Sequence, residues 1–245
     1  MKPDASVPAF QPLYRQIKLL ITEGLETGQW KPGESIPSEH ELAKRFNVSQ
    51  GTVRKAVNEL AQENVLVRQQ GRGTFVASHA HDRAQAAFLR IAPDAGDIES
   101  LAAELVDCRR VKADAASARN LDIPTGSPLM RIRRVLAING RKAIYEEARV
   151  PAGLFSGLDA NTVQEHRCML YSMYESVFHV RIVAAEERLK AVAADADMSS
   201  IMGIPAATPV LMIERVAYTY GRRAVELRRS FCECSAHHYH AAITS

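Results

Sequence analysis

Residues 37–58 of the chain, PSEHELAKRFNVSQGTVRKAVN, decide the fold of its N-terminal part. Ser38 and Glu41 have the spacing of a capping box and predict the start of a short helix. This helix should end at Asn47, because Ser49 is placed to cap a second helix after a tight connection. Two short helices joined in this way predict a helix-turn-helix.

The second of these helices has two different faces. One face is apolar at helical spacing and should pack on the core; it holds Val53, Ala56, Val57 and Leu60. The opposite face is polar, above all in its first turns, and presents Gln50, Gly51, Thr52, Arg54, Lys55 and Asn58. Such a helix matches a recognition helix that enters the major groove, and its free N–H groups favour phosphate.

The flanking segments complete a small domain. An apolar stripe of Leu13, Ile17, Leu20, Ile21 and Leu25 predicts a first helix that ends at Gly28. Beyond the helix-turn-helix, residues 65–67 and 74–76 predict two strands, and the glycine-rich turn between them carries Arg72. A hairpin of this kind predicts a wing that reaches a minor groove or the DNA backbone.

The charge of the chain is unevenly distributed, although its net value is only +3. Residues 44–76 carry two acidic groups against six basic ones, namely Lys44, Arg45, Arg54, Lys55, Arg68 and Arg72. From residue 79 onward, the chain contains 21 basic and 20 acidic residues. This imbalance indicates a module that contacts DNA, attached to an electrically neutral remainder.

The composition indicates an ordinary globular protein, with 47% hydrophobic and 24% charged residues. We expect a cytoplasmic protein with no membrane partner, because no apolar run approaches ~18 residues and no signal peptide is visible. Four scattered cysteines (Cys108, Cys168, Cys232, Cys234) indicate reduced thiols. The histidine-rich residues 237–240 could suggest a metal, but a surface tail is favoured, so we expect neither metal nor cofactor.

The C-terminal part mixes strands and helices. Residues 78–87 contain no large apolar side chain and predict a linker. After it we expect strands over 105–111, 129–138, 143–150, 210–220 and 223–232, and helices over 115–121, 162–177 and 195–202. Asn139-Gly140 is a strong hairpin signal. The expected class is therefore α+β, with helices packed on an antiparallel sheet.

Arg134 stands on an otherwise apolar strand face, formed by Met130, Ile132, Leu136 and Ile138. A charge there is costly unless it is paired or used. A two-residue turn at Asn139-Gly140 places Arg134 opposite Tyr145 and diagonal to Glu147, whereas a bulged turn places it opposite Glu146. Both registers bring a carboxylate to Arg134, which leaves a structural ion pair and a ligand-binding arginine as alternatives.

Residues 12–76 resemble the DNA-binding domain of the GntR family. The matching positions are Pro12-Leu13-Tyr14, Pro32-Gly33, Pro37-Ser38-Glu39, Glu41-Leu42-Ala43, Val48-Ser49, Thr52-Val53-Arg54, Ala56, Leu60 and residues 71–76. The resemblance implies a winged helix-turn-helix with DNA contacts from Gln50, Gly51, Thr52, Arg54, Gln70 and Gly71. Gln50 and His40 stand where arginine is common, so we expect an altered operator sequence.

Side-chain chemistry divides the expected DNA contacts into two kinds. Arg54 is suited to read a guanine and Gln50 an adenine, whereas Lys44, Arg45 and Arg68 are expected on phosphates. The full expected set is His40, Lys44, Arg45, Ser49, Gln50, Gly51, Thr52, Arg54, Lys55, Arg68, Gln70, Gly71 and Arg72.

The C-terminal part resembles the UTRA effector-binding domain of the HutC subfamily. The matching positions are Arg134, Gly140, Glu146, Pro151, Leu158, Leu170-Tyr171, Glu187, Ala191, Gly203, Pro209, Arg215 and Glu226. The resemblance implies a fold similar to chorismate lyase, a homodimer, and an effector pocket at Arg134, Glu146, Met169, Tyr171 and Glu226; the hairpin register adds Tyr145. Leu136 and Met169 replace an arginine and a serine of sugar-phosphate sensors, which favours a smaller carboxylate or a more apolar effector.

These features predict a transcription regulator, with repression the expected sign. We expect a DNA-binding domain over 1–77, a linker over 78–90 and an effector-binding domain over 91–245. The protein should bind a palindromic double-stranded operator as a homodimer and dissociate from it when a small molecule binds. The alternatives are a chorismate-lyase-like enzyme on a DNA tether, using Arg134 with Glu146 or Glu147, and an architectural DNA binder without effector. The sequence shows no nucleophile–base pair, metal cluster or phosphate loop, which favours the regulator.

Overall fold

The computed structural model describes residues 11–78, 89–167 and 169–241. The chain forms two compact units, Met1–Ala77 and Ser78–Ser245, each of which is described by itself. Of the predicted linker over 78–90, residues 79–88 lie outside the described residues, as does Cys168.

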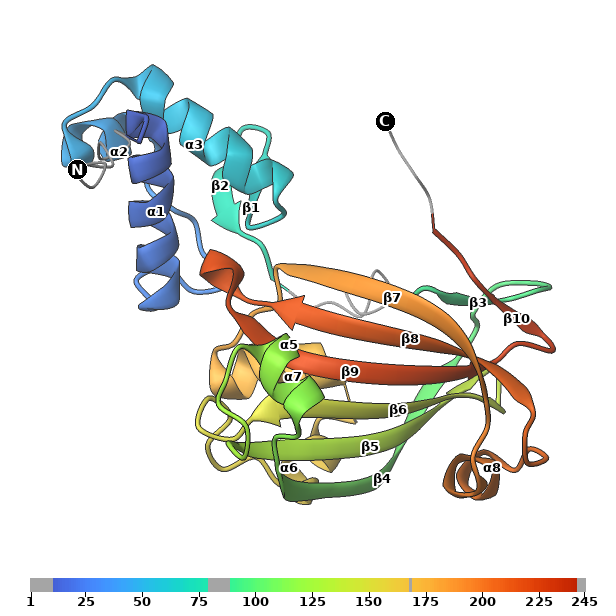
Figure 1. Cartoon of the computed structure of the whole chain (residues 1–245). Coiled ribbons are helices and arrows are strands. Elements are labelled where there is room, and N and C mark those ends of the chain that lie inside the picture. The colour runs from blue at the N-terminus through green and yellow to red at the C-terminus, as the bar shows by residue number, and fades with distance from the viewer. Residues whose placement is uncertain (1–10, 79–88, 168, 242–245) are drawn as a thin grey trace, which may run out of the picture. The chain divides into compact units, whose positions relative to one another are not determined.

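The first unit is a winged helix-turn-helix (Figure 1). It contains α1 (Leu13–Glu26), α2 (Glu39–Phe46), α3 (Gln50–Gln62), β1 (Leu66–Gln69) and β2 (Gly73–Val76). The two strands pair antiparallel, and a bridge from Ser35 to Phe75 joins the segment before α2 to the wing. The predicted capping box is confirmed, since Ser38 and Glu41 make both of its hydrogen bonds, and α2 ends at Asn47 in the left-handed conformation, with φ of 52°.

The core of the first unit lies between α1 and α3. Ile21, Leu42, Val53 and Leu60 are almost completely buried, as the helical spacing predicts. The predicted stripe of α1 is wrong at Leu13 and Leu20, because these side chains are 57% and 45% exposed. At about 100° per residue the buried arc of the helix is centred on Ile21, and both leucines lie beyond its edge.

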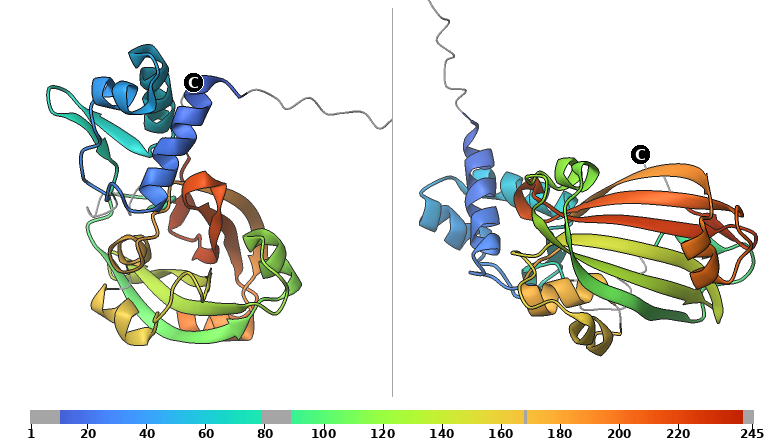
Figure 2. Two further views of the ribbon diagram at one scale, coloured as in Figure 1. Left: turned by 90° about the vertical axis from the view of Figure 1, so that its left-hand side faces the viewer. Right: turned by 60° about the horizontal axis from the view of Figure 1, so that its bottom comes forward.

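The second unit is built on one six-stranded antiparallel sheet (Figures 1 and 2). Its order is β4 (Leu101–Lys112), β5 (Pro128–Ile138), β6 (Arg141–Pro151), β9 (Ala224–Glu233), β8 (Pro209–Tyr218) and β7 (Ala184–Ala193). The remaining elements are β3 (Ile91–Pro93), α5 (Ala115–Leu121), α6 (Ala160–Glu165), α7 (Leu170–Phe178), α8 (Ala196–Met202), the 3-10 helix η1 (Tyr220–Arg222) and β10 (His237–Tyr239).

Helices pack on both faces of this sheet. On one face, α6 and α7 pack through Val163, Leu170 and Tyr174 against Ile132 and Ala148. On the other face, α8 packs through Met198 and Met202 against Val135 and Tyr145, and α5 covers Leu129. The α+β class with an antiparallel sheet is therefore confirmed.

Two local predictions for the second unit are wrong, and the strand β7 was not predicted. The helix expected over 162–177 is broken into α6 and α7, and Arg167 between them adopts a left-handed φ of 50°. The strand β7 was not expected, because its charged sequence has no β-branched run. Residues 237–240 are no surface tail, since β10 pairs with β3 and buries His237.

Candidate functional site

The exposed side of α3 carries the polar residues that the sequence places there. Ser49 caps the helix by accepting a hydrogen bond from the Thr52 amide at 3.2 Å. Gln50, Gly51, Arg54 and other polar residues of this side are exposed, while Val53, Ala56, Val57 and Leu60 are buried. The face is thus held rigidly by the core behind it and open to a partner in front.

Glu39 ties the recognition helix to the wing. Its carboxylate accepts hydrogen bonds from Arg54 Nε and Arg68 Nη2, each at 2.8 Å, and Arg68 also donates to Asn58 Oδ1 at 2.7 Å. Burial raises the pKa of Glu39, but the hydrogen bonds and charges of the two arginines outweigh it and lower that pKa. Glu39 therefore remains ionised and holds the guanidinium groups of two otherwise flexible side chains.

The structure brings six of the thirteen predicted DNA contacts to one hollow between α2, the start of α3 and the wing. His40, Gln50, Arg68, Gln70, Gly71 and Arg72 line it. Other predicted contacts have different neighbours: the Arg45 guanidinium lies 5.7 Å from the Trp30 ring, and Lys55 Nζ lies 3.9 Å from the Tyr14 ring. Sequence reasoning missed Glu39 as a member of this surface, although its place beside the cap residue Ser38 was a signal.

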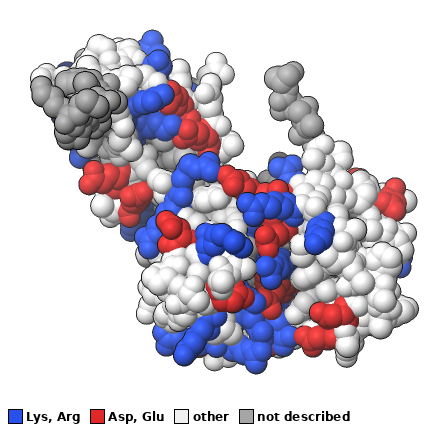
Figure 3. Space-filling view, viewed as in Figure 1, with Lys and Arg blue, Asp and Glu red and all other residues white. Residues whose placement is uncertain are grey.

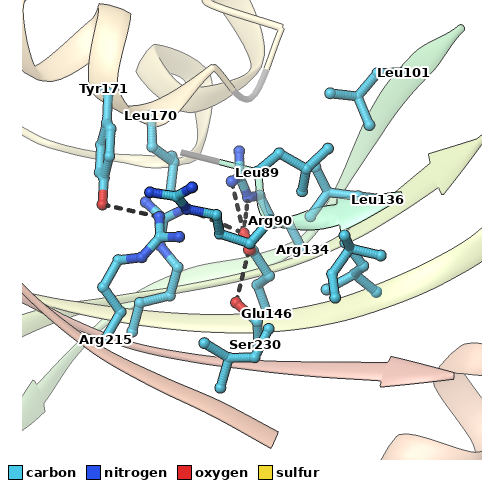
Figure 4. A pocket seen from close by; sticks show the side chains of 14 residues that line it. Leu89, Arg90, Leu101, Arg134, Leu136, Glu146, Leu170, Tyr171, Arg215 and Ser230 are labelled. Carbon is cyan, nitrogen blue, oxygen red and sulfur yellow. Dashed lines mark hydrogen bonds and ion pairs between the residues drawn. The ribbon is translucent and has the colours of Figure 1, made fainter. Parts of the chain in front are cut away.

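A second site lies in the second unit, on the sheet face that α7 covers (Figure 4). It holds about 520 Å³ of space, part of it open to solvent. Half of its lining is apolar and half carries polar or charged groups: Leu89, Arg90, Ile91, Leu101, Arg134, Leu136, Ile144, Glu146, Leu170, Tyr171, Ile213, Arg215, Arg228 and Ser230.

Arg134 pairs with Glu146 in the interior of this pocket. Arg134 is 2% and Glu146 5% exposed, and Arg134 Nη2 lies 2.6 Å from Glu146 Oε2. The register is shifted by one residue, as the bulged alternative predicts, but the shift occurs within the strands, next to Ala137, rather than in the two-residue turn. Strand alternation then aims Arg134 and Glu146 at the same face.

Each of the other two buried pocket arginines has a carboxylate of its own. Arg215 Nε donates to Glu187 at 2.7 Å, and Arg228 Nη2 donates to Glu226 at 2.7 Å. Tyr171 joins these pairs, because its hydroxyl donates to Glu226 at 3.1 Å and its ring lies 4.7 Å from the Arg228 guanidinium. Among the described residues, Arg228 Nε has no hydrogen-bond partner although it is buried.

The arginines keep the pocket carboxylate ionised. Burial raises the pKa of Glu146, but the charges of Arg134 and Arg228 and the hydrogen bond from Ser230 at 2.8 Å outweigh it, and the pKa is about 2. Burial likewise raises the pKa of Tyr171, so that this hydroxyl stays protonated and remains a donor.

Three of the predicted effector contacts lie outside the lining of this pocket. Tyr145 is wrong, because it pairs with Val135 and stacks on Phe231 at 6.0 Å on the opposite face of the sheet. Met169 occupies the N-cap position of α7, and Glu226 accepts a hydrogen bond from Arg228; neither belongs to the lining. Sequence reasoning missed Arg228 and Ser230, which follow from Glu226 by strand alternation along β9.

Comparisons with known proteins identify both units. Residues 13–76 match the model of the gntR family of bacterial regulatory proteins, and residues 99–238 match the UTRA domain. The chain belongs to the GntR family, in the group that carries a UTRA domain. Among the part of the chain that the structure describes, no helix is long and apolar enough to cross a membrane.

This GntR regulator is similar over most of its length to named repressors. It is 30% identical over 219 residues to the histidine utilization repressor of Klebsiella aerogenes, covering 86% of this chain and 85% of the relative. It is 28% identical to the HTH-type transcriptional repressor NagR of Bacillus subtilis, covering 89% of each chain. The ligand-binding domain of a GntR-family regulator from Bordetella bronchiseptica superposes with a TM-score of 0.62 at 34% identity, covering 64% of this chain and 98% of that one.

These relatives are transcription regulators, and the GntR protein described here is a DNA-binding repressor rather than an enzyme. The predicted regulator is confirmed, and the enzymatic alternative is not supported. GntR regulators bind DNA, and those with a UTRA domain bind a small-molecule effector through it.

Proposed function

We propose that two copies of this repressor hold a palindromic operator in the cytoplasm and release it when each binds a small carboxylate. In this proposal residues 1–77 bind DNA, residues 91–245 bind the effector, and residues 78–90 form the linker between these two domains. The two recognition helices would enter successive major grooves, about one helical turn apart. The relatives named above as repressors support the DNA-binding role.

The roles of the DNA-contacting side chains follow from their placement. Arg54 is exposed and held at its Nε by Glu39, which leaves its terminal nitrogens available for a guanine edge. Arg72 and Gly71 stand at the tip of the wing and are suited to a phosphate or a minor groove. Lys44, Arg45 and Lys55 are assigned to phosphates, which position the protein without reading sequence.

The observation that carries the effector class is the buried Arg228 Nε, which lacks a partner among the described residues. A buried donor left without an acceptor costs about 1–3 kcal/mol, and an anionic oxygen in the pocket would recover this energy. Arg90, which is exposed at the pocket lining, adds a further cation. The apolar half of the lining, with Leu136, Leu170 and Ile213, suits a carbon skeleton beside the carboxylate.

Helix α7 offers a route from the pocket to the connector. Tyr171 lines the pocket, and Glu175 follows one helical turn later. The carboxylate of Glu175 accepts a hydrogen bond from Ser78, the first residue of the second unit. A shift of Tyr171 on effector binding would move Glu175 with it, because α7 is one rigid helix, and would thus change the start of the connector.

The experiment is a fluorescence-anisotropy titration of the full chain on a duplex selected from a random pool. It is repeated with a panel of aliphatic and aromatic carboxylates, their amides and sugar phosphates. We expect one carboxylate to weaken binding by about 5–150-fold, the usual range of allosteric coupling, while its amide has no effect. Release by sugar phosphates alone, or by no anion in the panel, would contradict the proposed effector class.

A further inference from the structure

We propose that the outer edge of β7 is the surface through which two copies of this chain pair, by antiparallel addition of strand to strand. The inference rests on the dimer of the proposed function and assigns the strand that forms it. It is drawn from the exposure, the ladder and the charge pattern of Ala184–Ala193.

Strand β7 is the most exposed strand of the sheet. It pairs with β8 on one side, and with no strand on the other among the described residues. Eight of its ten residues are exposed, including Leu189 at 46%, so both faces of the strand lie open. A long strand with a row of unpaired N–H and C=O groups is a template for another strand.

The other edge of the sheet is protected. Strand β4 contains a register shift between Leu105 and Asp107, and α6 packs against it. A bulge of this kind blocks the addition of a further strand. Strand β7 has no register shift and no proline or glycine. Of the two edges, β7 is therefore the one that fits a partner strand.

The charges of β7 complement those of an antiparallel copy. Along the outer face Glu186 comes first, followed by Arg188 and Lys190. Glu186 pairs with Arg222 and Arg188 lies 3.8 Å from Glu214, but the Glu186 and Arg188 side chains remain 56% and 75% exposed. Figure 3 shows basic and acidic groups next to one another on the face of the second unit that it presents. An antiparallel copy sets the acidic end of one strand against the basic end of the other, whereas a parallel copy would oppose like charges.

The hydrogen bonding of the ladder limits the possible registers. The Ala194 backbone N–H donates to the Thr208 carbonyl at 2.9 Å and continues the register of β7 with β8. The backbone N–H and C=O groups of the even-numbered residues therefore bond to β8, and those of the odd-numbered residues point to the free edge. A register centred on Glu187 sets Glu186 opposite Arg188 of the second copy. A register centred on Arg188 sets Glu186 opposite Lys190 of the second copy. Both create two symmetric opposite-charge pairs. The register centred on Arg188 also sets the two Arg188 side chains opposite one another, whereas the register centred on Glu187 opposes two carboxylates that Arg215 already neutralises, so the register centred on Glu187 is favoured.

The test is the dissociation constant of the full-length dimer, measured by sedimentation equilibrium. Arg188→Glu/Lys190→Glu should weaken the dimer by at least about tenfold, because each of two symmetric attractions becomes a repulsion. Adding Glu186→Lys to that variant restores opposite charges and should restore the dimer. The matched control is Arg110→Glu/Lys112→Glu, an exposed Arg-x-Lys pair of the same spacing on β4.

Amide hydrogen exchange of the β7 segment in the wild-type protein supplies a second readout, which needs no charge-changing substitution. Its outward amides should be protected in concentrated wild-type protein and exposed on dilution. A dimer that survives the β7 reversal, or that only the β4 control disrupts, would overturn this inference and leave the proposed function standing. A chain that stays monomeric at every concentration, on and off DNA, would contradict both.

Discussion

Arg54 Nε donates a hydrogen bond to the Glu39 carboxylate at 2.8 Å, which connects the recognition helix α3 to the preceding helix α2. The same carboxylate holds Arg68 of the wing. The surface proposed to bind DNA is therefore ordered in the free protein, since two arginines from different elements bind the same carboxylate. Preorganisation of this kind lowers the entropy lost when long side chains bind.

Arg54→Ala should weaken binding to the selected operator by about 1–3 kcal/mol and binding to random duplex by much less. The reason is that a guanine reader contributes only where its base is present. Anisotropy titrations on the two duplexes at one salt concentration measure both effects. An equal loss on both duplexes would make Arg54 a phosphate contact.

Glu39→Gln should reduce the ratio of operator affinity to random-duplex affinity. The substitution removes a negative charge near the DNA, so binding to random duplex should rise slightly, while binding to the operator falls because Arg54 and Arg68 lose their anchor. Glu63→Gln is the control, since Glu63 pairs with Lys18 instead. A parallel rise on both duplexes would show that Glu39 acts through charge alone.

Arg72→Ala should weaken binding to every duplex alike. Arg72 lies exposed at the tip of the wing, where a phosphate is the expected partner. Loss of one phosphate contact lowers the slope of log affinity against log salt by about 1. The slope is measured between low and moderate salt, with Arg119→Ala on α5 in the second unit as the control, because Arg119 is exposed and belongs to neither site. An unchanged slope would remove the wing from the phosphate contacts.

Much of the first unit follows from local sequence. Ser38, Asn47 and Ser49 mark the ends of two helices through interactions within one turn, and such signals are visible in a single sequence. The hollow between α2 and the wing is different, because Glu39 and Arg68 are 29 residues apart and meet only in the folded unit. Spacing cannot predict a contact between elements.

The pocket shows the same limit. Strand alternation predicts that Arg134 faces inward, but a one-residue shift beside Ala137 decides whether Tyr145 or Glu146 stands opposite. Arg215 comes from β8 and Arg228 from β9, and their meeting depends on the order of the sheet. The sequence contained both arginines, but not the topology that brings them together.

Glu146→Gln should destabilise the second unit in a pH-dependent manner. The pKa of Glu146 is lowered to about 2 in the folded chain, so its ionised form stabilises the fold fully above pH about 4.5, and this contribution is lost as the pH falls toward 2. Removing one partner of a buried pair costs about 3–5 kcal/mol. The difference in unfolding free energy between wild type and variant, followed by near-ultraviolet circular dichroism, should shrink over that range. A constant difference would contradict the pairing.

Arg228→Met should abolish the response to the effector while operator affinity without effector changes little. Arg228 lines the pocket and belongs to the second unit, whereas the residues assigned to DNA belong to the first unit. Because the variant leaves Glu226 without its arginine, Arg228→Lys serves as the conservative comparison and should retain a weakened response. The anisotropy assay with the releasing carboxylate measures both. Full release from the Arg228→Met variant would move the anion site elsewhere.

The most direct measurement is selection of duplexes from a random pool by the full-length chain at low salt, followed by sequencing. A repressor with two recognition helices should enrich a palindrome whose half-sites lie about one helical turn apart, and Arg54→Ala should lose that enrichment. If the wild-type chain retains no duplex, or retains all sequences equally, this protein does not read an operator through α3.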